Sequence, residues 1–158
     1  AVLSRAMERF RQASQGPVLE RAAELFQTLT LGSFESLRPD CDEGGRDVLV
    51  GVRPGGQVVH TSGMSAGTCD QLYLALRIAL LESSLAGREP LPFIVDDILI
   101  MFDDARAAAA LNVLSKLAQK TQVIFFTHHA HLVDIAHDVL DGELHVHELC
   151  TSAQPVPA

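Results

Sequence analysis

Apolar residues in the first thirty positions recur at steps of three and four, the spacing that gathers side chains on one face of a helix. These positions are Met7, Phe10, Val18, Leu19, Ala22, Ala23, Leu25, Phe26 and Leu29. Gly16-Pro17 interrupts the pattern, and proline fits the first turn of a helix. The pattern therefore predicts helix over 1–30, with a second segment beginning near Pro17.

A pair of short strands is the next patterned feature. Val48, Val50 and Val52 occupy every second position, and Pro54-Gly55-Gly56 then turns the chain into residues 57–60. We expect a β-hairpin here, preceded by a loop over residues 32–45, where turn-forming residues are frequent.

Residues 70–86 form the most apolar segment, with Arg77 as the one charged residue between Leu72 and Leu81. This composition predicts a helix that is buried on most of its circumference. Two short apolar runs, 93–95 and 123–126, are typical of strands covered on both faces.

Further helices are expected at 105–118 and 130–137, and an edge strand at 143–148. The alternation of helices and strands after residue 70 predicts an α/β fold with a parallel sheet. The small and polar residues 150–158 are expected to form a flexible tail.

The composition fits one globular domain, because 47% of the 158 residues are hydrophobic and 20% are charged. No apolar run reaches the roughly 18 residues of a membrane span, and no signal peptide is recognisable. Cys41, Cys69 and Cys150 lie far apart, which argues against a disulfide framework or a zinc ribbon and favours a cytoplasmic location. The net charge of −8 lacks the basic signature of a nucleic-acid-binding domain.

Three segments carry candidate chemistry, and the first is Met64 to Thr68, directly before the buried helix. Free backbone N–H groups and the helix dipole favour an anion at such a position. Ser65 or Thr68 can act as an ordinary helix cap, or can offer a hydroxyl to a phosphate.

The second segment is Asp96-Asp97, at the end of an apolar strand. Two carboxylates there are costly to desolvate unless a cation or a donor pairs with them. One could hold Mg²⁺, and the other could orient or deprotonate a water. Alternatively, both acids complement a helix start. Asp103-Asp104 follow an apolar run that disfavours a solvated acidic face.

The third segment runs from Phe125 to His131 and contains His128, His129 and His131 at a strand end. One histidine there could bind a phosphate oxygen or the attacking water. Three clustered histidines also suggest zinc, so both interpretations stay open.

The order of these segments resembles the C-terminal lobe of the ATPase head of SMC-like ABC ATPases, which are P-loop NTPases. Residues 65–77 look most like the bacterial YhaN-like AAA-family proteins. The resemblance implies an α/β lobe over 31–149, with a parallel sheet core flanked by helices and a β-hairpin. It also implies that residues 1–30 are the end of a coiled-coil arm.

The resemblance assigns nucleotide-binding roles to five residues. Ser65, Ala66, Gly67 and Thr68 match the signature loop, which contacts ATP held by the opposite head. Asp103 matches the D-loop aspartate at the dimer interface. Ala66 and Thr68 depart from the usual Leu-Ser-Gly-Gly-Gln signature.

The remaining assignments are catalytic. Asp96 matches the Walker B residue that holds Mg²⁺, His128 matches the switch histidine, and Asp97 stands where the family commonly has a catalytic glutamate. No Gly-x-x-x-x-Gly-Lys-Ser/Thr occurs in the chain. We therefore expect an N-terminal Walker A lobe upstream, a homodimer formed through ATP, DNA as the client in repair or chromosome maintenance, and no ATPase activity from these 158 residues alone.

Two alternatives to an ATPase head remain. One is a non-catalytic lobe for dimerisation or interaction. The other is a zinc metallohydrolase that uses the cluster from His128 to His131, although Asp134 follows at the wrong spacing for the familiar metallo-β-lactamase motif.

Overall fold

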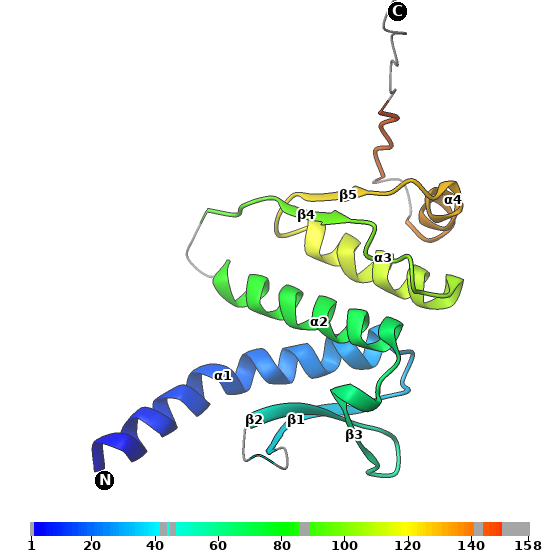
Figure 1. Ribbon diagram of the computed structural model, residues 1–158. Helices are drawn as coiled ribbons and strands as arrows, with labels where there is room; N and C mark the ends of the chain where they lie inside the picture. The colour runs from blue at the N-terminus through cyan, green and yellow to red at the C-terminus, as the bar shows by residue number, and fades with distance from the viewer. Residues whose placement is uncertain (1, 42–43, 45–46, 86–88, 141–143, 150–158) are drawn as a thin grey trace, which may run out of the picture.

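The computed structural model describes residues 2–41, 44, 47–85, 89–140 and 144–149. Over these residues the chain forms four α-helices, a short 3-10 turn and five strands in two separate sheets (Figure 1). The helices are α1 (Val2–Leu29), α2 (Ala66–Ser84), α3 (Asp104–Ala118) and α4 (Ala130–Val139). The strands are β1 (Ser36–Cys41), β2 (Asp47–Val52), β3 (Val58–His60), β4 (Phe93–Asp96) and β5 (Val123–Phe126). None of the helices in this part of the chain is long and apolar enough to cross a membrane.

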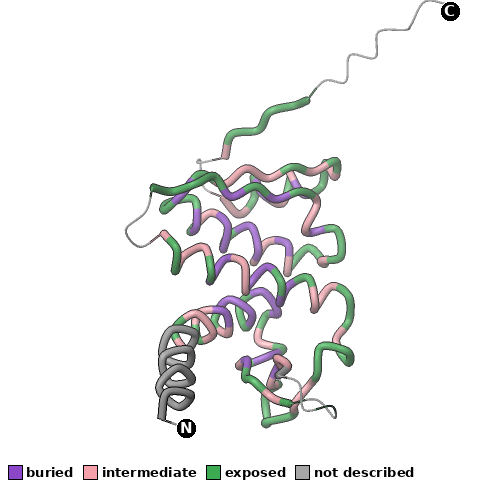
Figure 2. The backbone as a smooth tube through the Cα atoms, turned by 60° about the vertical axis from the view of Figure 1, so that its left-hand side comes forward, coloured by how far each residue is buried: buried purple, intermediate pink, exposed green. Residues whose placement is uncertain are grey.

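The elements follow one another as layers, from the β1–β3 sheet at one end to β4 and β5 at the other (Figure 1). Helix α1 packs against β1 and α2, and α3 packs against α1, β5 and α4. Phe26, Leu29, Ile78, Leu99 and Leu117 are almost completely buried in one continuous core. In Figure 2 the buried residues concentrate along the helices between the two sheets.

Helix α1 runs unbroken through Pro17, so the predicted interruption is wrong. Proline removes one backbone donor and crowds the preceding turn, which weakens a helix without always ending it. The turns that follow bury Ala22, Leu25 and Phe26, and this burial offsets the loss. The helix ends where Gly32 adopts a positive φ of 78° and its N–H donates to the Gln27 carbonyl at 2.9 Å.

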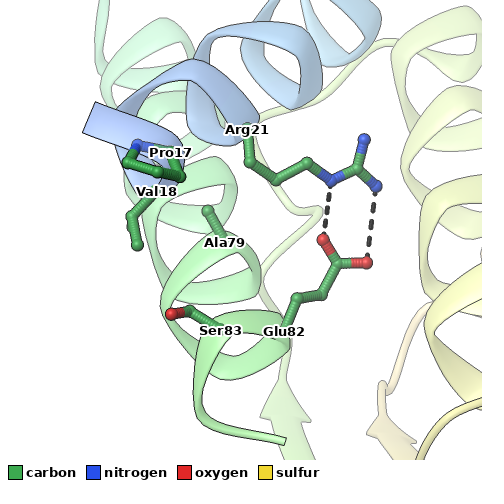
Figure 3. A pocket seen from close by; sticks show the side chains of 6 residues that line it. All are labelled: Pro17, Val18, Arg21, Ala79, Glu82 and Ser83. Carbon is green, nitrogen blue, oxygen red and sulfur yellow. Dashed lines mark hydrogen bonds and ion pairs between the residues drawn. The ribbon is translucent and has the colours of Figure 1, made fainter. Parts of the chain in front are cut away.

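Helices α1 and α2 are also joined by an ion pair. Arg21 Nε donates to Glu82 Oε2 at 2.6 Å, and Lys120 Nζ donates to Glu82 Oε1 at 2.8 Å. Figure 3 shows Arg21 and Glu82 pointing toward each other beside a shallow hollow lined by Pro17, Val18 and Ala79. The Glu82 carboxylate is thus paired with one cation from α1 and one from the turn after α3.

The predicted hairpin is present as β2 and β3, with Gly55 and Gly56 at positive φ in the turn. The loop predicted over 32–45 is wrong in part, because Ser36–Cys41 forms β1 and pairs with β2 in antiparallel register. Pro39 explains why the sequence does not predict this strand, because proline disfavours most strand positions. Proline is tolerated there because β1 lies at the edge of the sheet.

The predicted parallel pair is β4 and β5, with Ile94 opposite Ile124 and Asp96 opposite Phe126. The expected cover on both faces is absent within this chain, where only one face is covered. Phe93 and Val95 are buried, whereas Ile94 is 55% exposed and Phe126 is 41% exposed. One face of the pair packs on α3 and the other is open.

Helices α2, α3 and α4 confirm the predicted helices, although α2 begins four residues earlier than expected. The edge strand predicted at 143–148 is wrong, because residues 144–149 have no regular secondary structure and Glu143 is outside the described residues. The tail predicted at 150–158 also lies outside the described residues.

Candidate functional site

The two acids at the end of β4 occupy different backbone conformations. Asp96 is the last residue of the strand and is exposed. Asp97 has a φ of 47°, in the left-handed region that aspartate tolerates better than most residues. Its N–H donates to the Phe126 carbonyl at 3.0 Å, which extends the pairing with β5 by one step. The strand therefore ends between the two acids, and Asp97 belongs to the turn that follows β4.

Asp97 and His128 meet at the carboxyl ends of the two parallel strands. His128 Nδ1 lies 2.5 Å from Asp97 Oδ2, although the residues are 31 positions apart in the chain. The Asp97 side chain is 28% exposed and that of His128 is 69% exposed. The structure thus places the two predicted catalytic residues in direct contact.

The surroundings of Asp97 favour its ionised form. Desolvation raises the pKa of this carboxyl. The Thr127 hydroxyl and the His128 ring together lower the pKa by more than desolvation raises it, so the net pKa lies below its ordinary value. At neutral pH Asp97 is therefore an anion, and it can accept a proton or a hydrogen bond but not donate one.

Histidines 128, 129 and 131 follow one another along the loop after β5 and into α4. The rings of His128 and His129 have centroids 4.0 Å apart, and the His129–His131 ring centroids are 5.7 Å apart. The backbone N–H of His129 donates to Thr127 Oγ1 at 3.1 Å, and this hydrogen bond stabilises the turn that contains His128 and His129.

Two polar atoms of this region are buried and have no hydrogen-bond partner in the described part of the chain: Asp97 Oδ1 and His129 Nε2. One ligand atom from each of Asp97, His128 and His129 lies within 4.8 Å of the other two. The potential ligand set thus combines Asp97 with His128 and His129 and does not include His131, which belongs to the histidine cluster of the zinc alternative.

The segment from Ser65 to Thr68 forms the start of α2. Ser65 is the N-cap residue, and its Oγ accepts from the Thr68 N–H at 3.2 Å. The two hydroxyl oxygens are also 2.8 Å apart. The capping role is therefore confirmed, and the exposed residues Ser65 and Ala66 remain accessible at the helix N-terminus.

Gly67 packs tightly against the segment between β4 and α3. A Cβ atom built on this glycine would lie 2.7 Å from the Met101 carbonyl oxygen, so a larger residue would force the two segments apart. Sequence reasoning missed this contact, since nothing in the pattern around Met101 indicates that a helix start rests on it.

Asp103 is the N-cap of α3. Its Oδ1 accepts from the Arg106 N–H at 2.9 Å, and its Oδ2 lies 3.2 Å from Arg106 Nη1. Within the described residues, no hydrogen bond or ion pair joins Asp103 or Ser65 to the Asp97–His128 pair. The predicted site residues thus form one contacting pair and two separate helix starts.

Comparison with known proteins supports a common origin and a common fold. No protein-family profile matches the chain. The chain is 34% identical over 137 residues to YhaN of Bacillus subtilis (strain 168), an uncharacterized protein. The aligned region covers 86% of this chain and 14% of YhaN, so the chain spans only a small part of its relative.

Solved structures of SMC head domains share the fold. A structure from a study of the ATP-driven dimerization and DNA-stimulated activation of SMC ATPases has a TM-score of 0.65, at 19% identity, over 84% of this chain and 78% of the other. The Smc head domain with a coiled coil and joint from Pyrococcus yayanosii also has a TM-score of 0.65, at 19% identity, over 87% of this chain and 26% of the other. The predicted resemblance to YhaN-like proteins and the predicted α/β fold of an SMC-type head are thus confirmed.

Proposed function

We propose that the chain is the C-terminal half of an ATP-binding and ATP-hydrolysing head within a longer SMC-like protein. The observation that carries this proposal is the 2.5 Å contact of Asp97 with His128 at the carboxyl ends of β4 and β5. Open α/β sheets bind ligands at that edge. Sequence similarity to YhaN and the fold of SMC heads support the same assignment.

In this proposal Asp97 orients the hydrolytic water. Its Oδ2 is engaged by His128, which leaves Oδ1, an oxygen without a hydrogen-bond partner among the described residues, to accept a hydrogen bond from the water. His128 directs Nδ1 toward Asp97, and its Nε2 lies on the other side of a largely exposed ring, so in the imidazolium form the ring would donate Nδ1–H to Asp97 and Nε2–H to a phosphate oxygen. The two residues then act on the two partners of the reaction.

Asp96 fits the role of the Mg²⁺ ligand. Its carboxylate is exposed at the end of β4 and forms no ion pair with another described residue, so a hard cation can approach it. Mg²⁺ bound with the nucleotide would supply charge neutralisation of the phosphates.

We assign the start of α2 to ATP held by a second head. Helix geometry leaves the N–H groups of Ala66 and Gly67 without intrahelical partners, and the positive end of the helix dipole favours a phosphate there. Ser65 and Thr68 add hydroxyls to the same helix end. The exposed Asp103 would lie at the same interface, so two copies of the head would enclose the nucleotide.

We assign the open face of β4 and β5 to an N-terminal lobe of the same protein, which would also carry the missing phosphate loop. Ile94 and Phe126 lie on that face, and Leu91 just before β4 is 73% exposed. Residues 1–30 would then be the end of a coiled-coil arm, 31–149 the lobe, and 150–158 a flexible tail. We propose DNA as the client of the whole protein from its similarity to SMC ATPases alone, because the net charge of −8 gives this proposal no support.

The decisive experiment is Asp97→Asn in the full-length protein, with phosphate release and ATP-dependent dimerisation as readouts. We expect turnover to fall by about a hundredfold or more while the ATP-bound dimer persists, because positioning of a water is lost and nucleotide contacts are kept. Asp134→Asn, a change to an exposed acid on α4, is the matched control and should leave turnover unchanged. Equal turnover in the wild type and Asp97→Asn would instead favour the non-catalytic lobe.

A further inference from the structure

Three side chains at the ends of β4 and β5 are arranged as a ligand set. Asp97 follows β4, and His128 and His129 follow β5, and one ligand atom from each lies within 4.8 Å of the other two. The backbone contact of Asp97 with Phe126 and the Thr127 turn hold the three residues in place. The set is therefore a product of strand pairing and not of neighbouring positions in one flexible loop.

Two atoms of this set lack the hydrogen-bond partners that buried polar atoms normally have. Asp97 Oδ1 and His129 Nε2 are both buried and have no hydrogen-bond partner in the described residues. A buried polar atom without a partner destabilises the folded state, so a native fold seldom keeps one without a reason. A cation can satisfy both, because each atom offers it a lone pair.

We propose that Asp97, His128 and His129 form a binding site for a divalent transition metal ion of the zinc or cobalt type. Two imidazoles and one carboxylate match the ligand preference of these ions, whereas Mg²⁺ and Ca²⁺ prefer oxygen ligands alone. Ligand atoms around a tetrahedral zinc ion lie about 3.4 Å apart, so the three side chains, whose ligand atoms now lie within 4.8 Å of one another, would close around the ion on binding. Three protein ligands leave the fourth position to water.

His131 lies beside the ligand set but is not part of it. Its ring meets His129 edge-on at a centroid distance of 5.7 Å, and its side chain is exposed and outside the ligand set. It therefore provides a matched control, since it is the same residue type, two positions away, and it lacks a place among the ligands.

The site does not depend on ATP hydrolysis, because metal binding can be measured directly on the chain. The metal would replace the proton between Asp97 and His128, so metal binding and the proposed action of this pair on water exclude each other. Only that consequence rests on the proposed function.

The test uses the 158-residue chain, purified without a histidine tag and stripped of metal, with circular dichroism to confirm that every variant is folded. Calorimetric titration with Zn²⁺ and optical titration with Co²⁺ should each show one equivalent bound, with the intense visible bands of four-coordinate cobalt. Mg²⁺ at the same concentration should not compete.

His129→Gln should weaken Zn²⁺ binding by at least about tenfold, whereas His131→Gln should leave it unchanged. Asp97→Asn should weaken it as well and provides a second variant if His129→Gln does not fold. No stoichiometric binding by the wild type overturns the proposal. Equal affinities of His129→Gln and His131→Gln, whether both are retained or both are lost, also overturn it.

Discussion

The two ends of this molecule are built differently. Around α1 and α2 the chain completes most of its contacts within itself: Phe26 is fully buried and packs on Phe34 with ring centroids 4.9 Å apart, and Glu82 is paired with two cations, although Gln71 Oε1 on α2 is buried without a hydrogen-bond partner among the described residues. At β4 and β5 it does not. There one face of a two-stranded sheet is open, and two buried polar atoms beside it lack partners among the described residues.

The difference separates the scaffold from the chemistry. A scaffold gains stability from every contact it completes within its own chain. A site that binds nucleotide, metal or another lobe must keep part of its surface and part of its hydrogen-bonding capacity uncommitted. Substitutions should therefore unfold the isolated chain at the α1–α2 end and change binding at the β4–β5 end.

The largest expected effect comes from the same truncation made at both ends. Phe26→Ala removes a fully buried ring and should lower the free energy of unfolding by about 3–5 kcal/mol. Phe126→Ala removes a ring that is 41% exposed and should lower it by about 1 kcal/mol or less. Urea unfolding of the isolated chain, followed by circular dichroism, measures both. Equal losses would mean that the open face is part of the chain's own core.

Sequence periodicity predicted the elements on which burial leaves a clear pattern. Helices α2 and α3 and strands β4 and β5 are read correctly because apolar runs and their lengths distinguish them. Strand β1 was missed because Pro39 is tolerated only through its edge position, which is a property of the sheet. The break at Pro17 was predicted wrongly because packing against α2 outweighs a local preference.

The candidate site, like the fold, was predictable from the sequence only in part. Asp97 and His128 were both singled out because they follow strands, and parallel pairing brings their side chains into contact. The inclusion of His129, and the exclusion of His131, depends on how the chain turns at Thr127. The packing of Gly67 against Met101 depends on how closely the start of α2 approaches the segment between β4 and α3. Neither the turn at Thr127 nor the contact of Gly67 with Met101 can be predicted from the spacing of residues in the sequence.

The second prediction concerns the carboxylate that joins α1 to α2. Desolvation raises the pKa of Glu82. Hydrogen bonds from Arg21 and Lys120 lower the pKa by more than desolvation raises it, so the folded-state pKa lies below its ordinary value. Glu82→Gln should lower the free energy of unfolding by about 1 kcal/mol at pH 7, since both cations are substantially exposed. Glu24→Gln, which removes only an exposed pair on one helix, should change it by less.

The pH dependence of this effect has a definite sign. A carboxyl whose pKa is lowered by folding stabilises the protein above its unfolded-state pKa, and this contribution is lost as the pH falls through the folded-state pKa. The difference in unfolding free energy between the wild type and Glu82→Gln should therefore be full at pH 7 and shrink on acidification below about pH 4. A difference that persists at pH 2 would show that packing and not charge links Glu82 to α1.

The smallest expected effect on the isolated chain is at Ile94, and there the contrast between the two ends becomes sharpest. Ile94→Thr keeps a β-branched residue in β4 and alters a side chain that is 55% exposed, so unfolding of the 158-residue chain should change by less than about 0.5 kcal/mol. In the full-length protein, a lobe that covers this face would bury the same side chain. The substitution should then destabilise the head by about 1–2 kcal/mol, because apolar area is lost and a hydroxyl is buried. Thermal unfolding of both forms measures the difference between the two effects. If the change is equally small in both, Ile94 faces solvent in the whole protein, and the open sheet face is not where the two lobes meet.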